Sequence, residues 1–320
     1  MKRVNAGAGM VAAMMLVALA LDVAIGWPDA LYRRLGHPVT WMGALIKWLD
    51  TRLNTGPRAA RLTKGALTVL VLITTTGLLA TAAQLLLPAG PWGIILGGVL
   101  AWPFLALRSM YDHVAAVAGP LNAGDLPAAR HAVSMIVGRD PAQLDTAGVA
   151  RAATESLAEN TSDGIIAPLF WGLVAGLPGL VIYKAINTMD SMIGHRSERF
   201  EAFGKVAARL DDLVNLIPAR LTGALFALAS GSDLPRAWRV MRRDAGAHRS
   251  PNAGWPEGAM AGALGIRLSG PRLYAEGRAE EPWMNADAPD PTPQTLTAAL
   301  TLYRRAMALV VLALGLLILF

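Results

Sequence analysis

Long apolar segments separated by polar loops dominate the chain. About 20 mainly apolar residues in a helix cross the hydrocarbon core of a bilayer, so this pattern predicts an all-α, polytopic integral membrane protein with about 4–6 membrane-embedded helices. We interpret residues 1–320 as a single domain of this kind, with cytoplasmic helical loops. Simple spans are predicted near residues 9–27, 66–87, 92–107 and 306–320.

Two further apolar segments are interrupted by residues that a simple span avoids. Residues 164–183 carry two prolines and four glycines, and residues 213–230 contain Pro218 and Arg220 near their middle. Proline and charge at membrane depth are tolerated only where protein or a water-filled cavity surrounds them. We therefore predict that both segments form broken or re-entrant helices.

Basic residues indicate which loops face the cytoplasm. Lys and Arg are enriched in cytoplasmic loops, and here they gather between the first two predicted spans and in residues 231–305. Both loops, together with residues 108–163, are predicted to be cytoplasmic. We expect a multi-pass protein of the inner (cytoplasmic) cell membrane whose functional site faces the cytoplasm.

Composition narrows the possible chemistry. The chain is 54% hydrophobic and 16% charged, whereas soluble domains carry about 25% charged residues. It contains no cysteine, which excludes disulfides, thiolate catalysis and Cys-ligated metal centres. The formal net charge of +6 is spread between apolar segments and lacks a nucleic-acid-binding motif, so we predict the lipid bilayer and no nucleic acid as a partner.

Three polar clusters flank the interrupted segments, with acidic and amide side chains at helical spacing in each. They lie in ESLAENTSDG, YKAINTMDSMIGHR and LDDLVNLIPAR. Each cluster alone fits ordinary solvated helix ends and caps, but three of them beside the same two segments favour a functional site. Their members are Glu155, Glu159, Asn160 and Asp163; Lys184, Asn187, Asp190 and Arg196; and Asp211, Asp212, Asn215 and Arg220.

These residue types suit phosphate chemistry with a hard cation. Proteins usually hold Mg²⁺ through one or two carboxylates, water and substrate phosphates, and Lys and Arg bind phosphate oxygens. No G-x-x-x-x-G-K-[ST] motif occurs, so any use of ATP would not involve a P-loop.

Isolated polar residues elsewhere leave alternatives open. Asp22 lies within the first predicted span, where an ionisable residue is either functional or the partner of an interfacial arginine. His37 precedes a proline in a turn, and a lone histidine of this kind is more often structural than catalytic. The loop HRSPNAGWPEG, which contains Asn252, has the composition of loops that contact ligands and also of plain turns.

Several of these stretches together resemble the adenosylcobinamide-phosphate synthase family of cobalamin biosynthesis (CobD/CbiB). The resemblance rests on ESLAENTSDGIIAPLF, on YKAINTMDSMIGHRSERFEAFGKVAARLDDLVNLIPARLTG, on HRSPNAGWPEGAMAGALG and on the opening LDVAIGWPDALYRRLGHPVTWMG. It covers most of residues 20–275 in the same order, whereas residues 58–105 and 280–320 match only as hydrophobic helices and linker.

The resemblance implies an ATP- and Mg²⁺-dependent amide ligase. Such an enzyme joins cobyric acid, usually adenosylated, to (R)-1-amino-2-propanol or its O-phosphate and yields cobinamide or its phosphate. The implied partners are the corrinoid, the amino alcohol and other membrane enzymes of the pathway. Two alternatives stay open: a membrane transporter or assembly subunit without chemistry, and a metal-dependent membrane phosphotransferase.

The residue roles are predicted from the chemistry of the side chains. The predicted catalytic residues are Glu155, Glu159, Asp163, Lys184 and Asp190. The predicted Mg²⁺ ligands are Glu159, Asp163, Asp190, Asp211 and Asp212. The predicted ATP- or substrate-binding residues are Asn160, Asn187, Arg196, Arg220 and Asn252.

Overall fold

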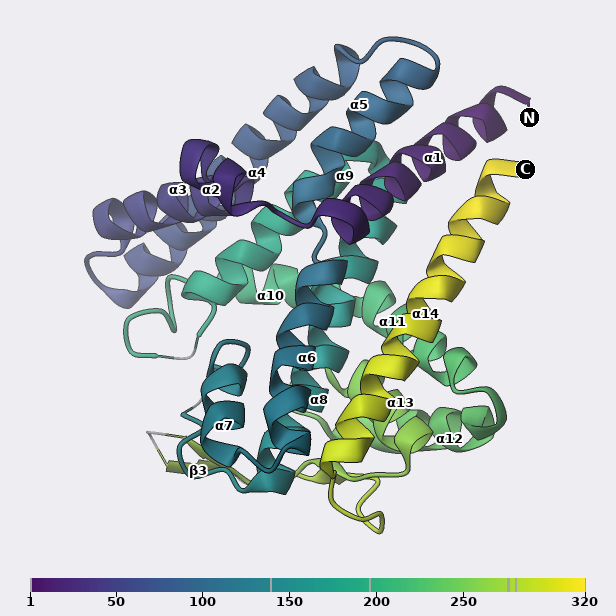
Figure 1. Cartoon of the computed structure of the whole chain (residues 1–320). Coiled ribbons are helices and arrows are strands. Elements are labelled where there is room, and N and C mark those ends of the chain that lie inside the picture. Colours follow the sequence, from purple (N-terminus) through teal and green to yellow (C-terminus); the bar gives the residue numbers. More distant parts are fainter. Residues whose placement is uncertain (1, 139, 196, 275–276, 280, 320) are drawn as a thin grey trace. The chain divides into compact units, whose positions relative to one another are not determined.

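The computed structural model describes residues 2–138, 140–195, 197–274, 277–279 and 281–319 (Figure 1). The chain divides into two compact units, and each is described by itself. Unit 1 comprises Met1–Ala106, Ala167–Asn215 and Ala313–Phe320, and unit 2 comprises Leu107–Ile166 and Leu216–Leu312.

Helix α9 is the central helix of unit 1. It packs against α1, α3, α4 and α10, while α5 packs against α1. The buried face of α9 carries Leu177, Leu180 and Tyr183. The helices of unit 1 are α1 (Lys2–Ile25), α2 (Asp29–Leu35), α3 (Pro38–Leu53), α4 (Arg58–Leu85), α5 (Pro91–Ala101), the 3₁₀ turn η1 (Trp102–Phe104), α9 (Ala167–Ile193) and α10 (Lys205–Val214).

The predicted break in the segment 164–183 is confirmed. Helix α9 leaves helical geometry at Ala175 and at Gly176, whose φ of +66° favours glycine. The Leu177 N–H that follows the break donates to Gln84 Oε1 on α4 at 2.8 Å. The backbone donor released by the break is therefore satisfied by a side chain of unit 1, as membrane depth requires.

Gln84→Leu is expected to destabilise unit 1 by about 1–3 kcal/mol, the usual cost of leaving a buried donor without an acceptor. Gln84→Glu keeps an oxygen at the same place and is the matched control. The apparent melting temperature of the detergent-solubilised protein reports the difference. Equal melting temperatures for the Leu and Glu variants would show that this hydrogen bond does not support the break.

The segment 213–230 is also broken. Helix α10 ends at Val214 and α11 (Leu216–Ala229) begins after Asn215. Pro218 lies in the first turn of α11, where its missing N–H costs no intrahelical hydrogen bond. The proline therefore begins a helix here and does not interrupt one.

The span predicted at 92–107 lies within Pro91–Asn122, one of the segments long and apolar enough to cross a membrane. This segment begins with α5, which has 11 residues. Pro103 follows at the start of η1, and the chain becomes extended at Leu105. The predicted final span is likewise part of a longer helix, α14 (Pro293–Leu319).

Helices and short strands surround α13 in unit 2. Helix α13 packs against α8, α11, α12, β1 and β4, and Val240, Ala261 and Leu268 belong to the core between them. The elements of unit 2 are α6 (Leu107–Asn122), α7 (Leu126–Ser134), α8 (Thr146–Thr161), the π-helix η2 (Ser162–Ile166), α11, η3 (Gly231–Asp233), α12 (Leu234–Asp244), η4 (Ala245–Ala247), α13 (Gly254–Leu264), β1 (Leu268–Ser269), β2 (Arg272–Tyr274), β3 (Gly277–Ala279), β4 (Trp283–Met284) and most of α14.

The strands form two antiparallel pairs, β1 with β4 and β2 with β3. Trp283 of β4 lies between two arginines, with the guanidinium carbons of Arg151 and Arg267 at 4.6 and 4.4 Å from its ring. Both arginines also hydrogen bond to Asp290, and the bond from Arg267 is the main cause that lowers the pKa of that carboxyl. This network fixes the segment between α13 and α14.

The membrane character expected from the sequence is confirmed. Within the part of the chain that the structure describes, 4 helices are long and apolar enough to cross a membrane, or up to 6 if each bent pair is one span. Long helices with small paired strands agree with the all-α prediction.

Candidate functional site

The predicted site residues are distributed over both units. Unit 1 holds Lys184, Asn187 and Asp190 on α9 and Asp211 and Asp212 on α10. Arg196 lies outside the described residues. Unit 2 holds Glu155, Glu159 and Asn160 on α8, Asp163 in η2, Arg220 on α11 and Asn252 in the loop before α13.

A hydrogen-bonded chain joins α9 to α10 in unit 1. The Tyr183 hydroxyl donates to Asn215 Oδ1 at 2.9 Å, and Asn215 Nδ2 donates to Asp211 Oδ2 at 3.0 Å. All three side chains are buried. The Asp211 Oδ1 atom is buried without a hydrogen bond of good geometry, and the Asn187 amide lies beside it. One oxygen of this carboxylate is thus held in place, and the other is available to a ligand.

Two more carboxylates surround Asp211. Asp190 and Asp212 both lie close enough to Asp211 for their charges to repel. Lys184 Nζ donates to Asn187 Oδ1 at 3.4 Å. We call Lys184, Asn187, Asp190, Asp211 and Asp212 the α9–α10 cluster. The structure thus brings together the members of the second and third predicted clusters that belong to unit 1, without Arg196, which is not described, and Arg220, which belongs to unit 2.

Asp190, near the end of α9, packs against Gly194, the first residue after the helix. The Gly194 N–H donates to the Asp190 carbonyl at 2.8 Å. A Cβ atom added at Gly194 would meet Asp190 Oδ1 at 2.0 Å, so the carboxylate lies directly against the glycine Cα. A side chain at this position would displace the Asp190 carboxylate from the cluster.

Glu155 has a structural contact that sequence alone did not indicate. It is buried, with an exposed fraction of 6%, and its Oε1 accepts the Ser269 N–H at 2.7 Å. Ser269 adopts a φ of +61°, a conformation that costs free energy for a residue with a side chain. Glu155 therefore holds the strained residue that ends β1.

Other predicted residues of unit 2 lie nearer the surface. Asn160 donates to the Ser156 carbonyl at 2.9 Å within α8, and Glu159 beside it is exposed. Arg220 donates to the Leu216 carbonyl at 2.7 Å and lies 4.3 Å from the ring of Trp255. The contacts of Arg220 are thus those of a helix side chain stacked on an aromatic ring.

A buried acidic group in unit 2 was not predicted. Glu257 on α13 has an exposed fraction of 1%, and its Oε1 lies 3.8 Å from His248 Nε2. Glu281 is buried and accepts a long bond from the Ser269 hydroxyl at 3.4 Å. Glu257 belongs to the loop HRSPNAGWPEG, which its composition had already marked in the sequence. His248, the first residue of this loop, accepts a hydrogen bond from the Ser250 N–H.

Isolated residues near α1 have defined surroundings in unit 1. His37 Nδ1 accepts the Val39 N–H at 3.2 Å and caps α3, so the structure gives it the structural role that a lone histidine more often has. Asp22 is buried, with an exposed fraction of 4%.

No complete protein-only metal site is present in the described part of the chain, where no three His, Cys, Asp or Glu side chains are placed to hold an ion. Mg²⁺ differs from zinc in this respect, because it commonly takes one or two protein carboxylates and completes its shell with water and phosphates. The α9–α10 cluster supplies such a partial set, including the available oxygen of Asp211.

Comparison with known proteins identifies close relatives. A family profile described as CobD/Cbib protein matches residues 15–303. The "Cobalamin biosynthesis protein CobD" of Rhodobacter capsulatus is 67% identical over 305 residues, which cover 95% of this chain and 96% of that protein. Proteins with the same name from Rhizobium meliloti and Brucella anthropi are 49% and 47% identical, over 85% and 92% of this chain and 86% and 92% of their own lengths. No solved structure matches the chain.

Proposed function

Because this chain belongs to the CobD/CbiB family, we propose that it acts in cobalamin biosynthesis as an adenosylcobinamide-phosphate synthase. In this proposal it is a carbon–nitrogen ligase that joins (adenosyl)cobyric acid to (R)-1-amino-2-propanol or its O-phosphate. The observation that carries the proposal is the extent of the match: the profile covers residues 15–303, and a relative named for cobalamin biosynthesis is 67% identical.

Amide formation needs an activated acid. A carboxylate is a poor electrophile at neutral pH, so ATP first transfers its γ-phosphoryl group to a carboxylate oxygen of the corrinoid and releases ADP. The amine of the amino alcohol then attacks the acyl carbon, phosphate leaves with the oxygen, and the surplus ammonium proton passes to a base. A bound Mg²⁺ would supply charge neutralisation on the phosphates.

The α9–α10 cluster has the donors that such a site needs. Asp211, held by Asn215 and with one oxygen available, and Asp190, held against Gly194, would bind the Mg²⁺. A cation there would also relieve the repulsion among the carboxylates. Lys184 would bind phosphate oxygens, and Asn187 would orient its neighbours.

The residues of unit 2 complete the proposed assignments. We also propose Glu159 and Asp163 as carboxylates that bind Mg²⁺, because both are more exposed to solvent than Glu155. We propose that the site faces the cytoplasm, where ATP is available, in the inner cell membrane. The bilayer, the corrinoid and the amino alcohol are the proposed partners, with other membrane enzymes of the pathway.

The direct test is synthesis by the purified protein. Protein in detergent or nanodiscs is mixed with adenosylcobyric acid, aminopropanol O-phosphate, ATP and Mg²⁺, and the corrinoids are analysed by mass spectrometry. We expect a new amide-linked corrinoid together with ADP, and none when Mg²⁺ is chelated. Absence of that product, in a mixture where the Rhodobacter capsulatus relative forms it, would refute the synthase and leave the transport and phosphotransfer alternatives.

A further inference from the structure

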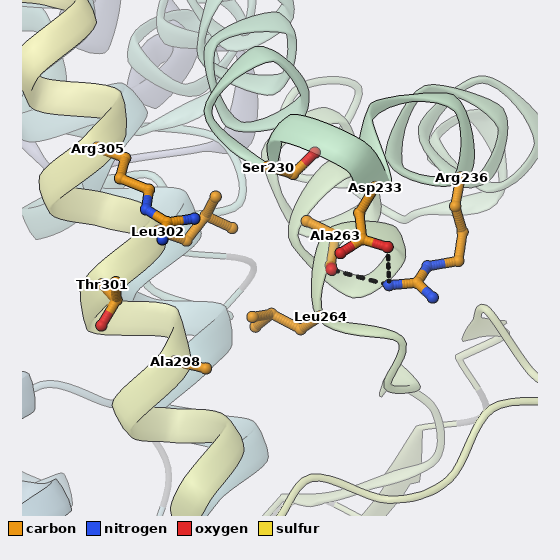
Figure 2. Close-up of a pocket in the computed structure, with 9 residues that line it drawn as sticks. All are labelled: Ser230, Asp233, Arg236, Ala263, Leu264, Ala298, Thr301, Leu302 and Arg305. Carbon is orange, nitrogen blue, oxygen red and sulfur yellow. Dashed lines mark hydrogen bonds and ion pairs between the residues drawn. The ribbon is translucent and has the colours of Figure 1, made fainter.

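A polar pocket in unit 2 lies outside all the residues assigned above (Figure 2). It has a volume of about 360 Å³ and lies between α14 on one wall and the ends of α11, α12 and α13 on the other. Its lining consists of Ser230, Asp233, Arg236, Ala263, Leu264, Ala298, Thr301, Leu302 and Arg305.

Two arginines line the pocket, and their surroundings differ. Arg236 is fully engaged: its Nε donates to Gly262 O at 2.6 Å and its Nη2 to Ala263 O at 3.0 Å, while Asp233 lies 2.9 Å away. It therefore caps the carboxyl end of α13. Arg305 reaches in from α14 (Figure 2), and no described residue forms a hydrogen bond or ion pair with it.

The pocket also has a defined relation to the apolar surface of unit 2. Arg305 directly precedes the apolar end of α14, and Ser230 directly follows the apolar helix α11. Leu228 on α11 and Leu312 on α14 have exposed fractions of 56% and 58%. Large apolar side chains on candidate spans are expected to face lipid, so the pocket lies where that surface ends. Basic pockets at this boundary bind lipid headgroups.

We infer that this pocket binds an aminoalkyl phosphate. The Arg305 guanidinium pairs with the phosphate, and the Asp233 carboxylate, which lines the cavity and also pairs with Arg236, binds the ammonium group. Two sources supply this chemistry: the headgroup of phosphatidylethanolamine in the surrounding membrane, and a soluble amino alcohol phosphate. Only the second source rests on the proposed function, in which such a phosphate is a substrate.

Binding is tested on the full-length protein without ATP or corrinoid, so the result is independent of turnover. Native mass spectrometry measures retention of phosphatidylethanolamine, phosphatidylglycerol and phosphatidylcholine, and calorimetry measures binding of O-phosphoethanolamine. The variants are Arg305→Gln and Asp233→Asn. Arg304→Gln is the matched control, because Arg304 is the neighbouring exposed arginine and does not line the pocket.

For Arg305→Gln we expect about tenfold weaker binding of the phosphate ligand, the loss typical of one charge-assisted hydrogen-bonded pair. Asp233→Asn should abolish the preference for phosphatidylethanolamine over phosphatidylglycerol while phosphate binding persists. Lipid retention identifies the membrane source, and binding of O-phosphoethanolamine alone identifies the soluble one. Equal binding by the Arg305 and Arg304 variants, or no binding of any probe by the wild type, would overturn the inference.

Discussion

Asp211→Asn is expected to lower amide-forming turnover by about 100-fold or more with little change in folding. The asparagine has the same shape, and its carbonyl oxygen can still accept the Asn215 hydrogen bond. What is lost is the negative charge on the oxygen that the α9–α10 cluster leaves available for a cation. The required Mg²⁺ concentration should rise together with the loss of turnover, which a purely structural role of Asp211 would not cause.

The matched control for this prediction is Glu198→Gln. Glu198 is an exposed carboxylate in the loop between α9 and α10, and its backbone carbonyl, which accepts from Arg61, is unchanged by the substitution. We expect wild-type turnover and an unchanged Mg²⁺ requirement. If the Asp211 variant keeps full turnover at low Mg²⁺, the cluster does not hold the catalytic cation, even if the synthase reaction itself is confirmed.

The helices of this protein could be predicted from its apolar segments, because a helix satisfies the backbone hydrogen bonds of such a segment within lipid. Sequence alone also identified both segments that contain a break, because glycine, proline and arginine interrupt their apolar pattern. It did not say where the second segment breaks, because a proline looks the same in the first turn of a helix as in its middle. The exact break at Asn215 depends on that side chain bonding Tyr183 and Asp211, which is a tertiary contact.

The residues of the candidate site could be predicted from the sequence, but their hydrogen-bond partners far along the chain could not. Asp211 and Asn215 are four residues apart, and helical spacing places them together. Tyr183 is 32 residues from Asn215, and Ser269 is 114 residues from Glu155. No local pattern encodes such pairs. Glu155 was therefore predicted as a catalytic residue with no sign of its bond to the strained residue Ser269.

The loop from Gly194 to Gly204 fixes the spacing of the two halves of the α9–α10 cluster. Gly204 is the residue immediately before α10, and a Cβ atom added there would lie 1.6 Å from the Ile193 carbonyl oxygen at the end of α9. The residue before Gly204 makes a similar close contact with α4: a Cβ atom added at Gly65 of α4 would lie 1.9 Å from the Phe203 carbonyl oxygen. Backbone meets backbone at both places, so neither neighbour can rotate away.

Gly204→Ala is therefore expected to destabilise unit 1 by about 3 kcal/mol or more, the upper range for overpacking, because only a backbone shift relieves the overlap. That shift moves α10 relative to α9, so turnover should fall as well. Gly315→Ala is the control: the glycine is inside α14, a Cβ there meets nothing within 4 Å, and alanine favours helix by about 1 kcal/mol. The apparent melting temperature in detergent is compared for both variants. A Gly204 variant as stable as the Gly315 variant would show that α9 and α10 are not held together by this close backbone contact.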